Sequence, residues 1–102
     1  MALYNRLTTI MRCPRCGNEA EMIIDLYFGC TDLLDYRLGD LYRWVPRKIP
    51  KNGGRPEGGN LNGEGYTECP VCHRDFFVIV HVRDDKLISV EPDLEKTPYI
   101  PG

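Results

Sequence analysis

The sequence lacks the features that mark several common classes of protein. No stretch approaches the roughly 18 consecutive apolar residues that span a membrane, and residues 1–13 show neither the basic head nor the apolar run of a secretory signal. No segment keeps the helical period of apolar residues, so we expect an all-β or mostly β fold. We therefore expect a single domain over residues 1–102, located in the cytoplasm, with no membrane partner.

Motifs for catalysis are also missing. The sequence has no nucleophile elbow and no phosphate-binding glycine loop, and neither of its two histidines falls in a motif with a carboxylate. Positive charge is not in excess either: 13 Lys and Arg against 15 Asp and Glu give a formal net charge of −2. This balance argues against a protein that coats nucleic acid. We predict that the protein is not an enzyme and has no small-molecule substrate.

The sequence does contain five cysteines in a short chain. With 102 residues, 42% of them hydrophobic, the chain can bury only a small core, to which a further crosslink would add stability. Four of the cysteines lie in two turns of one form, Cys13-Pro14-Arg15-Cys16 and Cys69-Pro70-Val71-Cys72. In a reducing compartment such closely spaced cysteines bind metal or do redox chemistry more often than they form structural disulfides.

The spacing of these cysteines suits a metal ion. Two intervening residues let the chain turn tightly enough for both sulfurs to reach one ion, and two such turns supply the closed shell of four sulfurs typical of structural zinc. The residue after each pair often needs a left-handed backbone, which Gly17 adopts without strain and His73 tolerates fairly well. We predict one zinc ion, with iron less favoured although four sulfurs also hold it. The predicted ligands are Cys13, Cys16, Cys69 and Cys72.

The two Cys-Pro-x-Cys knuckles resemble those of the zinc ribbon and rubredoxin-like class. In that class each knuckle lies at the tip of a β-hairpin and the metal joins two hairpins, so the resemblance implies a small antiparallel sheet. It covers about ten residues plus this topology. The 52 residues between the pairs exceed the common spacing of roughly 15–20, and His73 stands where rubredoxins usually have a second glycine.

Alternation of apolar residues locates the expected strands. Residues 20–28 place every second, apolar residue on one face, and residues 76–82 followed by 87–90 form the clearest hairpin. The segment 36–45 is a weaker strand or hairpin, with Tyr36, Leu38, Tyr42 and Trp44 on one face. Cys30, the odd cysteine, is expected to be a small half-buried side chain.

Two segments look different from these strands. Residues 46–65 hold three prolines and six glycines and are expected to form a long flexible loop, and residues 95–102 an extended tail. The loop also carries a local positive patch, because residues 46–56 have four basic and no acidic residues. Either this patch is a solvated linker or it contacts an anionic partner. The basic residues concerned are Arg47, Lys48, Lys51 and Arg55.

Three functional hypotheses follow, in order of preference. The first is a non-catalytic domain with structural zinc that mediates a macromolecular interaction, with a protein as the expected partner. The second is a nucleic-acid-binding zinc ribbon that uses the basic 47–55 loop. The third is a rubredoxin-like protein that transfers electrons through iron.

Overall fold

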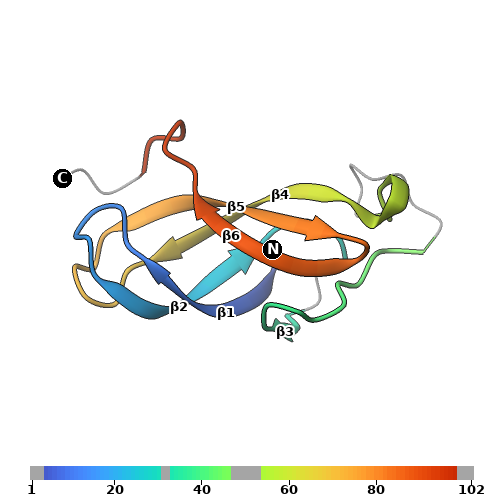
Figure 1. The fold of residues 1–102 in the computed structure, drawn as a ribbon, viewed down its shortest axis with the longest axis horizontal. Helices are drawn as coiled ribbons and strands as arrows, with labels where there is room; N and C mark the ends of the chain where they lie inside the picture. The colour runs from blue at the N-terminus through green and yellow to red at the C-terminus, as the bar shows by residue number, and fades with distance from the viewer. Residues whose placement is uncertain (1–3, 31–32, 47–53, 99–102) are drawn as a thin grey trace.

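The computed structural model describes residues 4–30, 33–46 and 54–98, and this part of the chain is all-β, as the sequence predicts. One six-stranded sheet has the order β3-β1-β2-β4-β5-β6 (Figure 1). The described part of the chain contains no helix that is long and apolar enough to cross a membrane. The strands are β1 (Asn5–Arg12), β2 (Glu19–Leu26), β3 (Asp35–Tyr36), β4 (Leu61–Glu68), β5 (Asp75–Arg83) and β6 (Lys86–Pro92), and a 3-10 turn, η2 (Glu57–Gly59), precedes β4.

The sheet is mixed rather than purely antiparallel. Strands β1 and β2 pair antiparallel along their whole length, as do β4 and β5, while β6 continues the meander beside β5. The short strand β3 lies parallel to β1, which differs from the expected antiparallel sheet. The two knuckles are therefore the turns of the β1–β2 and β4–β5 hairpins, as the resemblance implied.

The sheet curls so that the segment after its edge strand β3 is hydrogen-bonded to β6, the opposite edge. After β3 the backbone N–H of Gly39 donates to the carbonyl of Leu87 in β6 at 2.6 Å, and Leu87 donates back to Asp40 at 3.0 Å. The core fills the concave side. Its fully or nearly fully buried apolar residues are Leu7, Met11, Cys13, Met22, Ile24, Leu26, Tyr36, Tyr42, Cys69, Phe76, Val78, Val80, Val82 and Leu87.

The two strands expected with most support are confirmed. In β2 the residues Met22, Ile24 and Leu26 are buried while the intervening residues are exposed or half-buried. In β5 every second residue from Phe76 to Val82 is buried, and β6 completes the hairpin. Strand β1, which we did not predict, buries Leu7 and Met11 on the same face.

The segment 36–45 is not the strand or hairpin we expected. Strand β3 ends at Tyr36, and residues 37–40 turn away to reach β6. The aromatic side chains of this segment instead gather around Tyr42, whose ring centroid lies 4.9 Å from that of Tyr36 and 5.0 Å from that of Trp44. Packing between these rings and backbone hydrogen bonds to β6 and the β5–β6 turn, such as Tyr42 N–H to the Asp85 carbonyl at 2.6 Å, together place this segment.

The flexible loop expected over 46–65 is corrected at its C-terminal part, because β4 begins at Leu61. Two glycines that suggested a loop are instead buried in this strand. A Cβ atom at Gly63 would lie 2.3 Å from Phe28 Cε1, and one at Gly65 would lie 2.8 Å from Ile24 Cγ2. These glycines let β4 approach the core closely. Residues 47–53 lie outside the described residues, as do residues 99–102 of the expected tail.

Candidate metal centre

The two knuckles have the same backbone geometry. In the first, Cys13 N–H donates to the Asn18 carbonyl and Gly17 N–H donates to the Cys13 carbonyl, each at 2.9 Å. In the second, Cys69 N–H donates to the Arg74 carbonyl and His73 N–H to the Cys69 carbonyl, again at 2.9 Å.

The residue after each pair is left-handed, as the sequence predicts. Gly17 has φ 80° and His73 has φ 60°. A glycine takes this conformation freely, and histidine is among the residues that tolerate it. Two segments more than 50 residues apart in sequence therefore form matching turns.

The turns of the β1–β2 and β4–β5 hairpins lie at one end of the molecule (Figure 1), and they bring the four predicted ligands together. All four Sγ atoms lie within 4.8 Å of one another. The Sγ atoms of Cys13 and Cys72 are 3.8 Å apart, as are those of Cys16 and Cys69. A tetrahedral ion with metal–sulfur bonds of about 2.3 Å needs sulfurs separated by about 3.8 Å. These two separations match the tetrahedral value, so the cluster is compatible with one metal ion.

Backbone amides of each knuckle point at its first sulfur. Arg15 N–H donates to Cys13 Sγ at 3.3 Å, and Val71 N–H donates to Cys69 Sγ at 3.4 Å. Such donors stabilise a thiolate, which is the form that binds metal.

The thiols of one knuckle differ in acidity. Burial raises the pKa of Cys13 to about 12, whereas a hydrogen bond from the backbone of Asn18 lowers the pKa of Cys16 to about 7. A metal ion displaces both protons when it binds, so binding competes with protons and weakens in acid.

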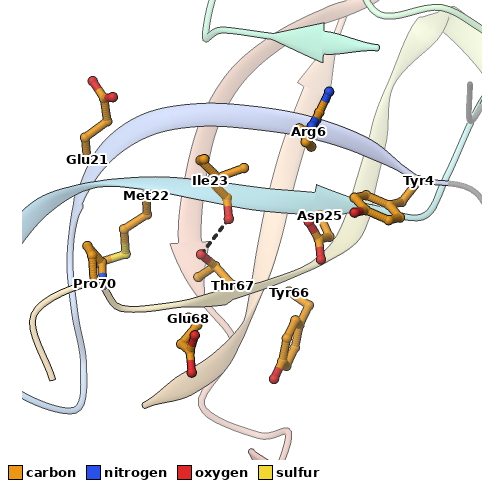
Figure 2. Close-up of a pocket in the computed structure, with 10 residues that line it drawn as sticks. All are labelled: Tyr4, Arg6, Glu21, Met22, Ile23, Asp25, Tyr66, Thr67, Glu68 and Pro70. Carbon is orange, nitrogen blue, oxygen red and sulfur yellow. Dashed lines mark hydrogen bonds between the residues drawn. The ribbon is translucent and has the colours of Figure 1, made fainter. Parts of the chain in front are cut away.

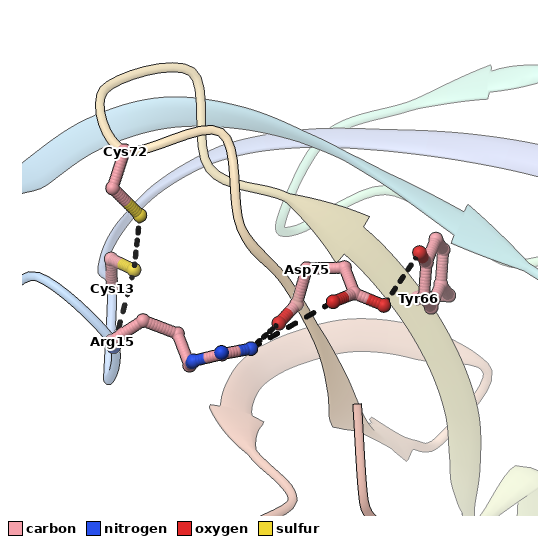
Figure 3. Close-up of polar contacts among 5 residues, drawn as sticks. All are labelled: Cys13, Arg15, Tyr66, Cys72 and Asp75. Carbon is pink, nitrogen blue, oxygen red and sulfur yellow. Dashed lines mark hydrogen bonds and ion pairs between the residues drawn. The ribbon is translucent and has the colours of Figure 1, made fainter. Parts of the chain in front are cut away.

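An ion pair also connects the two knuckles (Figure 3). The Arg15 guanidinium reaches from the first knuckle to the start of β5, where Nη1 donates to the Asp75 carbonyl at 2.8 Å and lies 3.7 Å from Oδ1. The Asp75 side chain is fully buried, and its Oδ2 accepts a hydrogen bond from Tyr66 at 2.8 Å. Asp75 follows the second knuckle closely, so this contact supports the geometry that the metal requires. No sequence motif marked Asp75.

In the predicted basic patch, the one described residue, Arg55, is already in an ion pair. Arg55 forms a bidentate contact with Asp85, with Nε 2.8 Å from Oδ1 and Nη2 3.0 Å from Oδ2. Trp44 Nε1 donates to the same Oδ1 at 2.8 Å. Arg55 thus fastens its segment to the β5–β6 turn. The other three members of the patch, Arg47, Lys48 and Lys51, lie outside the described residues.

The remaining cysteine and histidines do not join the cluster. Cys30 is half-buried, as expected, and within the described chain the group of metal ligands includes neither Cys30 nor His73. His81 lies on the outer face of β5, with Nε2 3.2 Å from Glu91 Oε1.

Comparison with protein-family models, curated proteins and solved structures finds no match to this chain. The assignment of a metal site therefore depends on the chemistry and geometry of the four cysteines.

Proposed function

We propose that this protein is a non-catalytic domain in which one zinc ion joins two hairpins, and that its outer surface binds a partner protein. The observation that carries the proposal is that four sulfurs, drawn from two pairs distant in sequence, lie within 4.8 Å of one another, with two of their separations at the tetrahedral value of 3.8 Å. Four protein ligands close the coordination shell and leave no position for a substrate or water, which is typical of structural rather than catalytic zinc.

The size of the core explains why a metal would be needed. A structural zinc site contributes on the order of 10 kcal/mol of apparent binding free energy. The whole stability of a typical domain is about 5–15 kcal/mol. In a sheet whose core is small, a metal ion of this strength decides whether the two hairpins stay together.

The outer face of the sheet supports a protein partner. Ile10 in β1 is 65% exposed and Ile23 in β2 is 57% exposed, and the register makes them diagonal neighbours. The half-exposed ring of Tyr27 follows on the same strand face. Exposed aliphatic and aromatic side chains of this kind are typical of the centre of protein interfaces. A nucleic-acid partner is less supported, because Arg55 is committed to Asp85.

Metal analysis with an absorption spectrum tests the proposal. We expect one zinc per chain in a colourless protein. Serine at Cys13 or at Cys69 should abolish binding and lower thermal stability sharply, while Cys30→Ser, the matched control outside the cluster, should change neither.

Other results would point elsewhere. A coloured protein with iron and reversible reduction would replace the proposal with electron transfer. Salt-sensitive DNA binding that weakens when Arg47, Lys48 and Lys51 are neutralised would replace the protein partner with nucleic acid. A metal-free, stable protein would contradict the proposal altogether.

A further inference from the structure

A groove opens on the outer face where the two hairpins meet (Figure 2). The described pairing between β2 and β4 consists of Asp25 with Tyr66 and Leu26 with Gly65, while the cysteine knuckles bring the hairpins together at the opposite end. Between these points Thr67 Oγ1 donates to the Ile23 carbonyl at 2.8 Å. The resulting groove has a volume of about 440 Å³.

The lining of the groove is acidic and aromatic. Its carboxylates are Glu21, Asp25 and Glu68, and its rings are Tyr4 and Tyr66. Its one basic side chain, Arg6, already pairs with Asp35, with Nε 2.9 Å from Oδ1. The balance of charge in the groove therefore favours a cation.

Asp25 adds a reason for a cation to bind. Burial raises the pKa of Asp25 above its ordinary value, and a hydrogen bond from Tyr27 and the charge of Arg6 only partly oppose this effect. The ionised carboxylate is therefore incompletely stabilised by the protein. A bound cation would stabilise it further.

Beside the groove, the chain itself holds a lysine against a carboxylate and a ring. After β6, the Lys96 ammonium forms an ion pair with Glu64 and lies 5.0 Å from the centre of the Phe77 ring. Glu64 and Tyr66 share one face of β4, and Phe77 is the partner of Tyr66 on β5. Next to the groove, a carboxylate beside an aromatic ring thus holds a cation. The groove has the same two kinds of side chain, carboxylates and aromatic rings.

The groove also borders strand edges. The β2–β4 register begins at Asp25 and Thr67 occupies the Ile23 carbonyl, so the part of β2 before Ile23 is the edge that runs along the groove. An extended peptide can lie beside such a strand and place every second side chain in the groove.

We propose that this groove binds an extended segment of a partner protein and seats an arginine or lysine of that segment among Glu21, Asp25 and Glu68. The inference depends on the proposed function, in which the surface binds a protein, and names the chemistry that the partner presents.

The experiment uses the zinc-loaded chain and two capped peptides, one of alternating arginine and valine and one with glutamate in place of arginine. Amide NMR shifts locate the binding site, and fluorescence anisotropy gives the affinity. We expect the arginine peptide alone to bind and to shift the amides of residues 21–25 and 66–68.

Variants test the role of the carboxylates. Asp25→Asn and Glu68→Gln should each weaken binding about two- to fivefold. Glu57→Gln, which removes an exposed carboxylate of η2 outside the groove, should leave the affinity unchanged. Asp25→Lys should abolish binding of the arginine peptide.

The inference is overturned if both peptides bind equally, if the shifts fall outside the groove, or if the zinc-loaded protein binds neither. It is also overturned if the groove is covered by a second copy of the chain, seen as a stable dimer whose interface includes β2. Zinc content and thermal stability are measured on the same sample. A metal-free sample contradicts the proposed function, whereas a folded, zinc-loaded sample that ignores the peptide contradicts only the groove.

Discussion

The two ends of the sheet are closed in different ways. At the knuckle end, four sulfurs from two hairpins lie within 4.8 Å of one another. At the other end the rings of Phe28, Tyr36 and Trp44 pack around Tyr42, with centroid separations from 4.8 to 5.0 Å. In the proposed metal-bound form, the first end concentrates its stability in four side chains and an ion, whereas the second distributes it over many contacts.

Each end also has a polar link of its own. Arg15 joins the two knuckles through the buried Asp75. At the ring end, Asp85 receives hydrogen bonds from Trp44 and Arg55. In the sequence, Trp44 precedes and Arg55 follows residues 47–53. The Arg15–Asp75 link is the more buried of the two, so its loss should cost more stability. An ion pair away from water is costly to break, whereas an exposed one contributes little.

Removal of the metal should have the largest effect. Chelation or Cys13→Ser should cost on the order of 10 kcal/mol and unfold the chain, because the remaining core cannot hold the hairpins together. Circular dichroism and thermal melts with and without chelator measure this. A melting temperature unchanged by chelator would show that the ring end suffices alone.

Breaking the buried ion pair should come second. Arg15→Met removes the Arg15 charge from beside the buried Asp75 carboxylate and should cost about 3 kcal/mol in urea unfolding of the zinc-loaded protein. Arg12→Met, an exposed arginine on the same hairpin, is the control and should cost far less. Equal losses for both variants would mean that the Arg15 contact adds nothing.

Removal of one hydroxyl at the ring end should cost less. Tyr42 donates to the Phe28 carbonyl and accepts from Asn5 Nδ2 at 2.9 Å, and both Tyr42 and Asn5 are buried. Tyr42→Phe should therefore cost about 1–3 kcal/mol.

When the metal site is loaded with cobalt in place of zinc, its absorption spectrum should be the same in Tyr42→Phe as in the wild type, since the two ends are separate. Tyr27→Phe, at a half-exposed ring, is the control for stability. A changed cobalt spectrum would mean that the ends are coupled.

The smallest expected effect is at Asp85 and depends on pH. Hydrogen bonds from Arg55 and Trp44 hold the pKa of Asp85 below its ordinary value near 3.8. The ionised form thus stabilises the fold above pH 3.8, and this contribution is lost as the pH falls through the lowered pKa. The stability advantage of the wild type over Asp85→Asn should persist near neutrality and vanish in acid.

The single tryptophan, Trp44, reports this unfolding by fluorescence when metal is kept in excess. Asp84→Asn, in the same turn, is the matched control. If the difference in unfolding free energy between the wild type and Asp85→Asn grows as the pH falls, the predicted sign of the effect is wrong.

Much of the candidate site could be predicted from sequence because its determinants are local. The cysteine spacing and the left-handed positions of Gly17 and His73 belong to two short turns, and each turn forms from its own residues. The strands at 19–26 and 75–83 were predictable for the same reason, since alternation is a local pattern.

Features that depend on distant partners were missed. Gly63 and Gly65 suggest a loop by composition, and their place in a strand follows from Phe28 and Ile24 packing against them. Arg55 suggests a free charge until Asp85 is found beside it. Asp75 carries no signal of its own until Arg15 reaches it from 60 residues away.

The sequence by itself determined the all-β class, the two matching turns and the two cysteine pairs that come together, because short-range spacing specifies each of them. Only the tertiary structure decided that the sheet curls until the segment after β3 reaches β6 and that a groove lined by three carboxylates and one arginine opens between the hairpins. These features arise where segments far apart in the chain meet. At such places, whether a charged residue can attract a ligand depends on whether a partner from another segment already neutralises its charge.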